Sequence, residues 1–391
     1  MSTQSTAGGL GGLGGLGGLG GLGGLGGLGG LGGLGGSGGL GGLGLVGGLG
    51  SLNLANSGPV AEALISTRDG IVGPWAPPAA TPAQLNYDDP INLELWEPWV
   101  RASVFDFELV SHLGFRRAGG NMILQHLLPA GPSYRRLAVI SRPTAARFRQ
   151  YLVFLNSYAD LRGDRAAEIV TQMNGTLAFL SSIPFLNPSR TRYTFELLGA
   201  ALRLANFVEM RFKQALASRR PNEYSPQVQP MILTPSHSTY PSGHATEAFT
   251  SAYVLWRLLR ASGRPPYGHP SWLTQLMRLA SRIAINRTVA GVHFPVDSAA
   301  GCFLGIQLGR YLWRLGTGGA NYPAYRFIGT AYPWGNPPPN DGDFYWEVIF
   351  RRLHFPTPPI VPYIANQGVH PLTPSPMLRW LWQRARQEWL L

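Results

Sequence analysis

The sequence of 391 residues predicts an all-α fold, a helical bundle. Apolar residues recur at helical spacing in several long segments, for example Phe249, Ala252, Tyr253 and Trp256. Alternating runs of Val, Ile and Thr, which are typical of the strands of a large sheet, do not stand out. Proline or serine precedes several of the periodic segments, at the position where a helix begins. We therefore expect helices packed on helices, in a chain that is 45% hydrophobic.

The first 57 residues differ in composition from the rest. Gly-Gly-Leu recurs through residues 8–50, and no charged residue occurs before Glu62. Glycine-rich chains lose much conformational entropy on ordering, so the sequence predicts a disordered tail over 1–57. An arm that self-associates or adheres to a surface is the alternative. Residues 58–391 are expected to form a single helical catalytic domain.

The expected helices follow one another with short links. In order, they are predicted at 93–113, 143–161, 165–180, 192–219, 245–260, 271–287, 295–313 and 376–389. Irregular chain is expected over 58–90, 222–240 and 316–375, where proline and polar residues interrupt the apolar pattern.

Composition limits the classes of function. The 32 Lys and Arg against 20 Asp and Glu give a net charge of +12, which suits an anionic ligand. The sequence contains no dense block of Lys and Arg and no motif typical of nucleic-acid binding, so we do not expect a nucleic-acid partner. Cys302 is the one cysteine, which excludes an internal disulfide. No apolar run approaches the roughly 20 residues of a membrane span and no signal peptide is recognisable, so we expect a soluble protein, cytoplasmic or exported without such a signal.

Pro241-Ser242-Gly243-His244 is the first chemical feature. It precedes a periodic segment, which places Ser242, Gly243 and His244 at a helix start. The free N–H groups and positive dipole end there favour an oxyanion, Gly243 allows close approach to the backbone, and His244 can transfer a proton. The alternative is an ordinary Ser cap followed by an exposed histidine.

Lys213 and Arg220 form the second feature. Seven residues make nearly two helical turns, so both cations project from one helix face, and Pro221 follows them. The ammonium group of Lys213 is a compact charge and the guanidinium group of Arg220 is planar with several donors, and both suit a tetrahedral oxyanion. The alternative is a solvated basic face.

The third feature contains Arg287, His293 and Asp297. Pro295 suits the first turn of a new helix, which leaves His293 just before that helix and Asp297 within it. A carboxylate four positions away could fix the tautomer of His293 by accepting its second N–H. The alternative is a boundary histidine beside an ordinary first-turn acid.

Taken together, these patterns resemble a known superfamily. Lys-x6-Arg-Pro, Pro-Ser-Gly-His and Arg-x5-His-x3-Asp occur in that order within 213–301. They are similar to the motifs that unite vanadium-dependent haloperoxidases, type 2 phosphatidic acid phosphatases (the PAP2 superfamily) and bacterial class A acid phosphatases. Asn286 departs from the pattern, since the family usually has Ser before the arginine. The resemblance implies a helical bundle of the haloperoxidase and acid phosphatase type.

The resemblance also implies roles for the motif residues. Three cations would neutralise the equatorial oxygens of bound vanadate or phosphate, namely Lys213, Arg220 and Arg287. Ser242 and the Gly243 amide would add hydrogen bonds. His293 would bond to the vanadium of vanadate or attack phosphorus, with Asp297 orienting it. His244 would act as the acid–base group on the opposite side.

Three observations lead us to predict the peroxidase among these activities. Membrane spans are missing, a long helical region precedes the motifs, and His237 lies seven residues before His244, as in the bromoperoxidases that this part of the chain resembles. The prediction is a vanadate-dependent haloperoxidase that oxidises bromide or iodide with hydrogen peroxide to hypohalous acid, which attacks a small organic acceptor. A soluble PAP2-type acid phosphatase acting through a phosphohistidine is the alternative. A non-enzymatic scaffold or surface protein is a lesser one.

Overall fold

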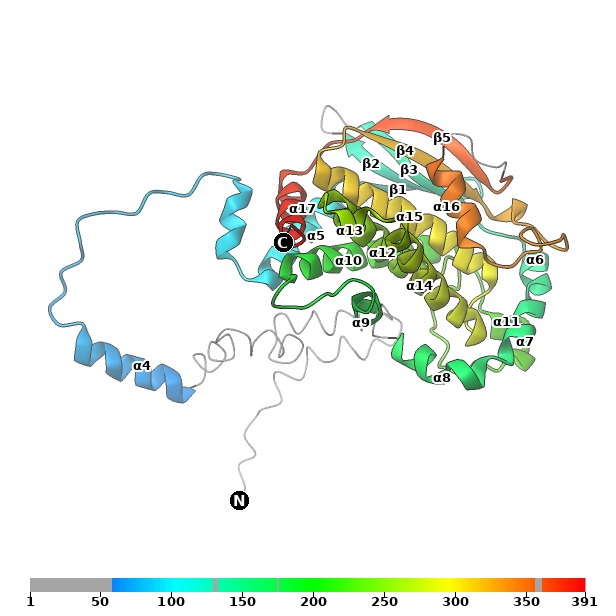
Figure 1. Cartoon of the computed structure of the whole chain (residues 1–391), viewed down its shortest axis with the longest axis horizontal. Helices are drawn as coiled ribbons and strands as arrows, with labels where there is room; N and C mark the ends of the chain where they lie inside the picture. Colours follow the sequence, from blue (N-terminus) through cyan, green and yellow to red (C-terminus); the bar gives the residue numbers. More distant parts are fainter. Residues whose placement is uncertain (1–57, 129–132, 174–175, 356–360, 391) are drawn as a thin grey trace, which may run out of the picture.

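The computed structural model of the chain describes residues 58–390, except 129–132, 174–175 and 356–360. Figure 1 shows a helical body with a sheet along one side. Helices predominate, at 57% of the structure, but a mixed sheet of five strands is also present. The prediction of an all-α fold is therefore correct only for the helical body. The predicted disordered tail, 1–57, lies outside the described residues.

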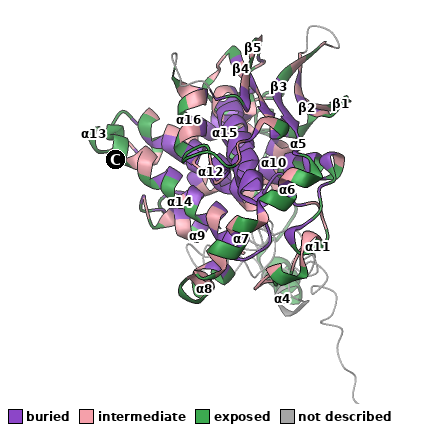
Figure 2. Cartoon of the chain, turned by 90° about the vertical axis from the view of Figure 1, so that its right-hand side faces the viewer, coloured by how far each residue is buried: buried purple, intermediate pink, exposed green. Residues whose placement is uncertain are grey.

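Four long helices form the centre of the body: α10 (Arg192–Leu216), α12 (Gly243–Ala261), α14 (Pro270–Val289) and α15 (Pro295–Thr317). Each begins within two residues of its predicted start, because the apolar periodicity and the prolines mark it. The helices α12 and α15 are buried along nearly their whole length (Figure 2). They carry the motif residues into the core.

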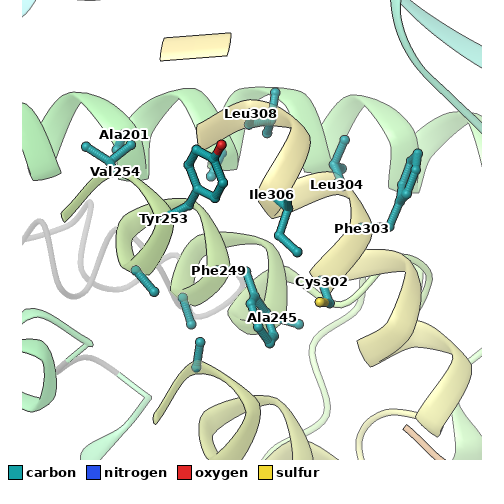
Figure 3. Packing of buried hydrophobic residues seen from close by; sticks show 14 of the residues in the cluster. Ala201, Ala245, Phe249, Tyr253, Val254, Cys302, Phe303, Leu304, Ile306 and Leu308 are labelled. Carbon is teal, nitrogen blue, oxygen red and sulfur yellow. The ribbon is translucent and has the colours of Figure 1, made fainter. Parts of the chain in front are cut away.

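Close packing between α12 and α15 depends on three glycines of α15, spaced four residues apart: Gly301, Gly305 and Gly309. A Cβ on Gly305 would lie 2.5 Å from the backbone oxygen of Thr246 and 2.8 Å from Cβ of Phe249. Figure 3 shows Phe249 of α12 near Ile306 of α15 in this interface. The missing side chains allow the two backbones to come into direct contact.

The sheet has the order β1-β2-β3-β4-β5 and consists of β1 (Leu113–Ala118), β2 (Asn121–Leu128), β3 (Ser133–Ser141), β4 (Asn321–Ile328) and β5 (Ile364–Pro371). Only β3 and β4 pair in parallel; the other neighbours are antiparallel. The sheet packs on α10 and α15. The sequence did not predict it because 137–141 of β3 is buried throughout and so lacks alternation.

The other elements surround this centre. Before α10 come α4 (Gly58–Ile71), η3 (Pro90–Leu95), α5 (Pro98–Ser111), α6 (Ala145–Gln150), α7 (Leu152–Ala159), α8 (Arg162–Thr171) and α9 (Thr176–Ser181). After it come α11 (Pro221–Tyr224), η4 (Pro226–Val228), α13 (Pro265–Gly268), η5 (Gly329–Ala331), α16 (Trp346–His354) and α17 (Pro376–Gln387).

Two segments predicted to be irregular contain regular structure. Helix α4 lies within 58–90, and its described residues are exposed (Figure 2), so no buried apolar face could have revealed it. The segment 316–375 contains β4, α16 and β5, which are held by pairing and packing against distant parts of the chain. Within the described ranges, every helix is too short or too polar to cross a membrane.

Candidate active site

The three motifs meet where the ends of four central helices come together. Lys213 lies in the last turn of α10, Ser242 caps α12, and Arg287 is near the end of α14. His293 stands in the link before α15, and Asp297 is in the first turn of α15. The backbone N–H of Ser242 donates to the carbonyl of Asp297 over 3.0 Å, which joins two of the motifs directly.

His293 is held at both ring nitrogens. Its Nδ1 lies 3.0 Å from Oδ2 of Asp297, and that oxygen also accepts from Thr239 Oγ1 at 2.5 Å and Phe294 N at 2.9 Å. A carboxylate only accepts, so the ring proton belongs on Nδ1. Nε2 then carries the lone pair and lies 3.2 Å from Nη1 of Arg220. The predicted His293–Asp297 pair is present and fixes the tautomer.

The pKa values at this pair favour a neutral imidazole. Burial lowers the pKa of His293 well below its usual value, and the charges of Arg220 and Lys213 lower it further. Burial raises the pKa of Asp297 to about 6, opposed by the hydrogen bonds from Thr239 and Phe294. At neutral pH, Nε2 of His293 is therefore unprotonated, and the proton on Nδ1 faces the carboxylate of Asp297.

Arg220 is 3% exposed and is oriented by main-chain carbonyls. Its Nε donates to the His237 carbonyl at 3.0 Å and its Nη1 to the Val292 carbonyl at 2.9 Å. Nη2 lies 3.0 Å from Nδ1 of His237, so His237 contacts Arg220 with both its main chain and its ring. Burial lowers the pKa of Arg220 to about 10, which leaves it charged at neutral pH.

Lys213 is 1% exposed and donates from Nζ to the carbonyls of Ser238 and Thr239, at 3.1 and 3.2 Å. Burial, with the charge of Arg220, lowers the pKa of Lys213 to about 7. An anion bound nearby would favour the charged form. The alternative, a solvated basic face, is excluded for Lys213 because this side chain is buried.

The sequence reasoning missed two glutamates beside Lys213. Glu209 lies one turn before it on α10, and Glu247 lies one turn after Gly243 on α12; each is 1% exposed. Burial raises the pKa of Glu209 well above its usual value and that of Glu247 to about 7, while the charge of Lys213 lowers both. Their position on otherwise apolar helix faces was the available signal.

The carboxylate of Glu209 leaves no room for a side chain at position 243, which explains the glycine there. A Cβ at this position would lie 2.5 Å from Oε1 of Glu209, so a side chain would displace the carboxylate. Ser242 caps α12 through Oγ, which accepts from the Ala245 amide at 3.4 Å. The hydroxyl proton of Ser242 is left for another acceptor, and the first N–H groups of the helix have no carbonyl partner within it.

Arg287 is 1% exposed and is anchored through one nitrogen, Nη2, to the Ile169 carbonyl at 2.9 Å and to Gln172 Oε1 at 3.2 Å. Its Nε and Nη1 are buried without a hydrogen-bond partner in the described part of the chain. Asn286 donates to the same Gln172 oxygen at 2.9 Å. The residue that departs from the family pattern therefore supports Arg287 through Gln172.

His244 is the group on which the cations converge. It is half-buried, and its Nε2 is buried without a hydrogen-bond partner among the residues that the structure describes. Burial lowers its pKa well below the usual value, followed by the charges of Arg287, Lys213 and Arg220. Unpaired donors and three buried cations around one imidazole form a site that can stabilise an oxyanion.

Comparison with known proteins agrees with this geometry. Residues 196–318 match the family model described as the PAP2 superfamily. The predicted resemblance to the PAP2 superfamily is confirmed over these residues, which contain all three motifs. It is 29% identical over 142 residues to a Mycobacterium tuberculosis protein named decaprenylphosphoryl-5-phosphoribose phosphatase, a match that covers 36% of this chain and 71% of the relative. The protein of that name from Mycolicibacterium smegmatis is 31% identical over 127 residues, covering 32% and 62%.

These PAP2 relatives overturn the predicted haloperoxidase activity. They are phosphatases, so the assignments as an oxidoreductase, a peroxidase and a vanadium enzyme were wrong. The motifs could not separate the two reactions, because vanadate and phosphate have the same shape and charge. A role for His237 in bromide oxidation is withdrawn with the activity; the structure places this residue against Arg220. An enzyme remains supported, and a phosphatase is favoured.

Proposed function

We propose that the chain is a phosphatase that hydrolyses an organic phosphate monoester through a phosphohistidine at His293. The observation that carries this proposal is the polarity of the His293 ring. Nδ1 faces the carboxylate of Asp297, and Nε2 faces the guanidinium of Arg220. A lone pair on Nε2 beside a cation is the arrangement that a nucleophile needs when its target is an anionic phosphorus centre.

Substrate binding uses the buried cations. The phosphate dianion is held by Arg220, Lys213 and the free Nε and Nη1 of Arg287. The Ser242 hydroxyl and the start of α12 add hydrogen bonds. The negative charge of the dianion raises the pKa of His244 and of Lys213, so both become protonated as the substrate binds.

In the first step, Nε2 of His293 attacks phosphorus, and an N–P bond forms as the ester P–O bond breaks. The leaving oxygen keeps the bonding pair and takes a proton from His244, which releases the alcohol. Asp297 stabilises the positive charge that develops on the His293 ring. The cations stabilise the charge on the equatorial oxygens.

In the second step, water attacks the phosphohistidine. The now neutral His244 accepts a proton from the water, an O–P bond forms, and the N–P bond breaks. Inorganic phosphate leaves, and His293 regains its lone pair. Substrate and water are thus converted to alcohol and phosphate, with no oxidant or reductant.

The name of the relatives points to a class of substrate. They are named for a 5-phosphoribose compound. We include sugar phosphates in the proposal, and ribose 5-phosphate is the substrate to compare with a simple aryl phosphate.

Phosphate release from both compounds by the purified chain tests the proposal. We expect hydrolysis that is inhibited by orthovanadate and abolished in His293→Ala. His370→Ala, on β5, is the matched control and should retain activity. Undiminished hydrolysis by His293→Ala, or no hydrolysis of either ester by the unmodified chain, would refute the function.

A further inference from the structure

A cavity of about 860 Å³ lies at the corner of the molecule where the β1–β2 hairpin approaches the end of α10 and the start of α6. Figure 2 shows β1, β2, α6 and α11 on one side of the molecule. Volumes of this size accommodate a small organic ligand. None of the predicted catalytic residues lines the cavity.

The lining is strongly basic. It includes four arginines and no aspartate or glutamate among the residues that the structure describes; the arginines are Arg117, Arg142, Arg219 and Arg326. Like charges repel one another at short range unless a counter-charge is present. A cavity with this lining favours a ligand with several negative charges.

Two of these arginines have charges that are free to bind a ligand. The side chain of Arg326 makes no hydrogen bond or ion pair with any described residue, and its Nε is buried. Arg117 donates only from Nε, to the Gly119 carbonyl at 3.1 Å. By contrast, Arg219 pairs with Glu223 at 3.1 Å, and Arg142 donates to two carbonyls at the end of α10.

Two further polar atoms of the lining are buried without a hydrogen-bond partner in the described ranges. They are Oγ of Ser141, a residue that is 8% exposed, and Oδ1 of Asn121. A buried polar group left unpaired destabilises the fold. The Ser141 hydroxyl and the guanidinium groups can donate to an anionic ligand, and the Asn121 oxygen can accept from a hydroxyl group of the same ligand.

One wall of the cavity is aromatic. Phe148 and Tyr224 line it, with ring centroids 6.1 Å apart, and both contact Phe294, the neighbour of His293. This wall suits the ring or carbon skeleton of an organic ligand. Through Phe294, this wall contacts the segment that contains His293.

We propose that this cavity is a second anion-binding site, which takes a phosphorylated organic ligand through Arg117, Arg326 and Ser141. The site does not depend on the proposed phosphatase reaction. The ligand chemistry is the same for a free phosphorylated metabolite and for a phospholipid headgroup, and the two sources can be separated by experiment.

Calorimetric titration with inorganic pyrophosphate tests the proposal. We expect two sites in the unmodified chain, one at the cations around His293 and one in the cavity. In Arg117→Ala/Arg326→Ala the second site should weaken at least tenfold, while hydrolysis of an aryl phosphate stays unchanged. Arg116→Ala/Arg278→Ala removes the same charge from positions outside the cavity and should bind as the unmodified chain does.

Arg117→Ala alone, at an exposed position, provides a second variant if the double variant fails to fold, and it should also weaken the second site. A single pyrophosphate site in the unmodified chain would overturn the proposal. So would a second site that is unaffected by the cavity substitutions.

The source of the ligand is decided by two further probes. Binding of fructose 1,6-bisphosphate that depends on Arg117 and Arg326 would indicate a free metabolite. Flotation with vesicles of phosphatidylglycerol in phosphatidylcholine, lost in the double variant, would indicate a headgroup. Binding of both probes unaffected by these substitutions would contradict the proposal.

Discussion

Replacing Gly305 by alanine tests the packing that positions the active site. The new Cβ would meet the Thr246 oxygen at 2.5 Å, Phe249 Cβ at 2.8 Å and the Thr250 nitrogen at 3.0 Å. Two of these atoms belong to the backbone of α12, so the two helices must separate by about 0.9 Å, about half of it by each helix, to bring the 2.5 Å contact to 3.4 Å. Overpacking of this kind costs about 1–3 kcal/mol.

The same displacement reaches the site. Thr246 is one turn after Ser242, and Asp297 is on the same helix as Gly305. Since misplacement by about 1 Å can cost about a hundredfold in rate, we expect kcat to fall about tenfold in Gly305→Ala. Urea unfolding and hydrolysis of an aryl phosphate measure the two effects.

Gly163→Ala is the matched control. Gly163 lies within α8, and a Cβ there would contact nothing within 4 Å. Alanine is the better helix former, so this variant should gain about 0.5–1 kcal/mol and keep full activity. Equal stability of the two variants, or a Gly305→Ala protein as stable and active as the unmodified chain, would refute the packing argument.

Three further outcomes are expected. Asp297→Asn should lower kcat by about a thousandfold or more with little change in KM, because the tautomer of His293 is no longer fixed. Steady-state kinetics measures this, and a fall in kcat of less than about tenfold would contradict the expectation. Glu247→Gln removes a charge that raises the pKa of Lys213, so inhibition by phosphate should be lost at a lower pH than in the unmodified chain. The control Glu62→Gln should leave the pH dependence of inhibition unchanged. A shift of that dependence to higher pH in Glu247→Gln would disprove the coupling. The pKa of His293 is lowered in the folded state, so its contribution to stability is present above pH 6.5 and is lost as pH falls below it. Relative to His293→Gln, the free energy of unfolding of the unmodified chain should fall by up to about 1.4 kcal/mol per pH unit below pH 6.5. Urea unfolding measures it, and the same pH dependence of the unfolding free energy in both proteins would exclude this effect.

Helix periodicity and proline positions predicted the elements that carry the chemistry. The motif residues did lie together, since each stood at a helix end that its local sequence marked: Ser242 as a cap, and Pro295 in the first turn after His293. Prediction succeeded where the determining contacts are within one or two helical turns.

Features that depend on distant partners were not predictable in this way. The edge strand β5 contains the polar residues Asn366 and Gln367 and is held by its pairing with β4. Glu209 and Glu247 were missed because glutamates in helices are usually exposed. The choice of reaction was wrong because the motif describes an oxyanion site, and it contains no residue that separates phosphate transfer from vanadate chemistry.

The most direct test of the proposed mechanism is to trap the intermediate. The chain is mixed with an aryl phosphate, quenched in alkali, in which phosphohistidine persists, and digested for mass spectrometry. The account predicts phosphate on the peptide that contains His293, and none in His293→Ala. An active preparation that carries phosphate on another residue, or on none while phosphorus inverts its configuration during turnover, would contradict it.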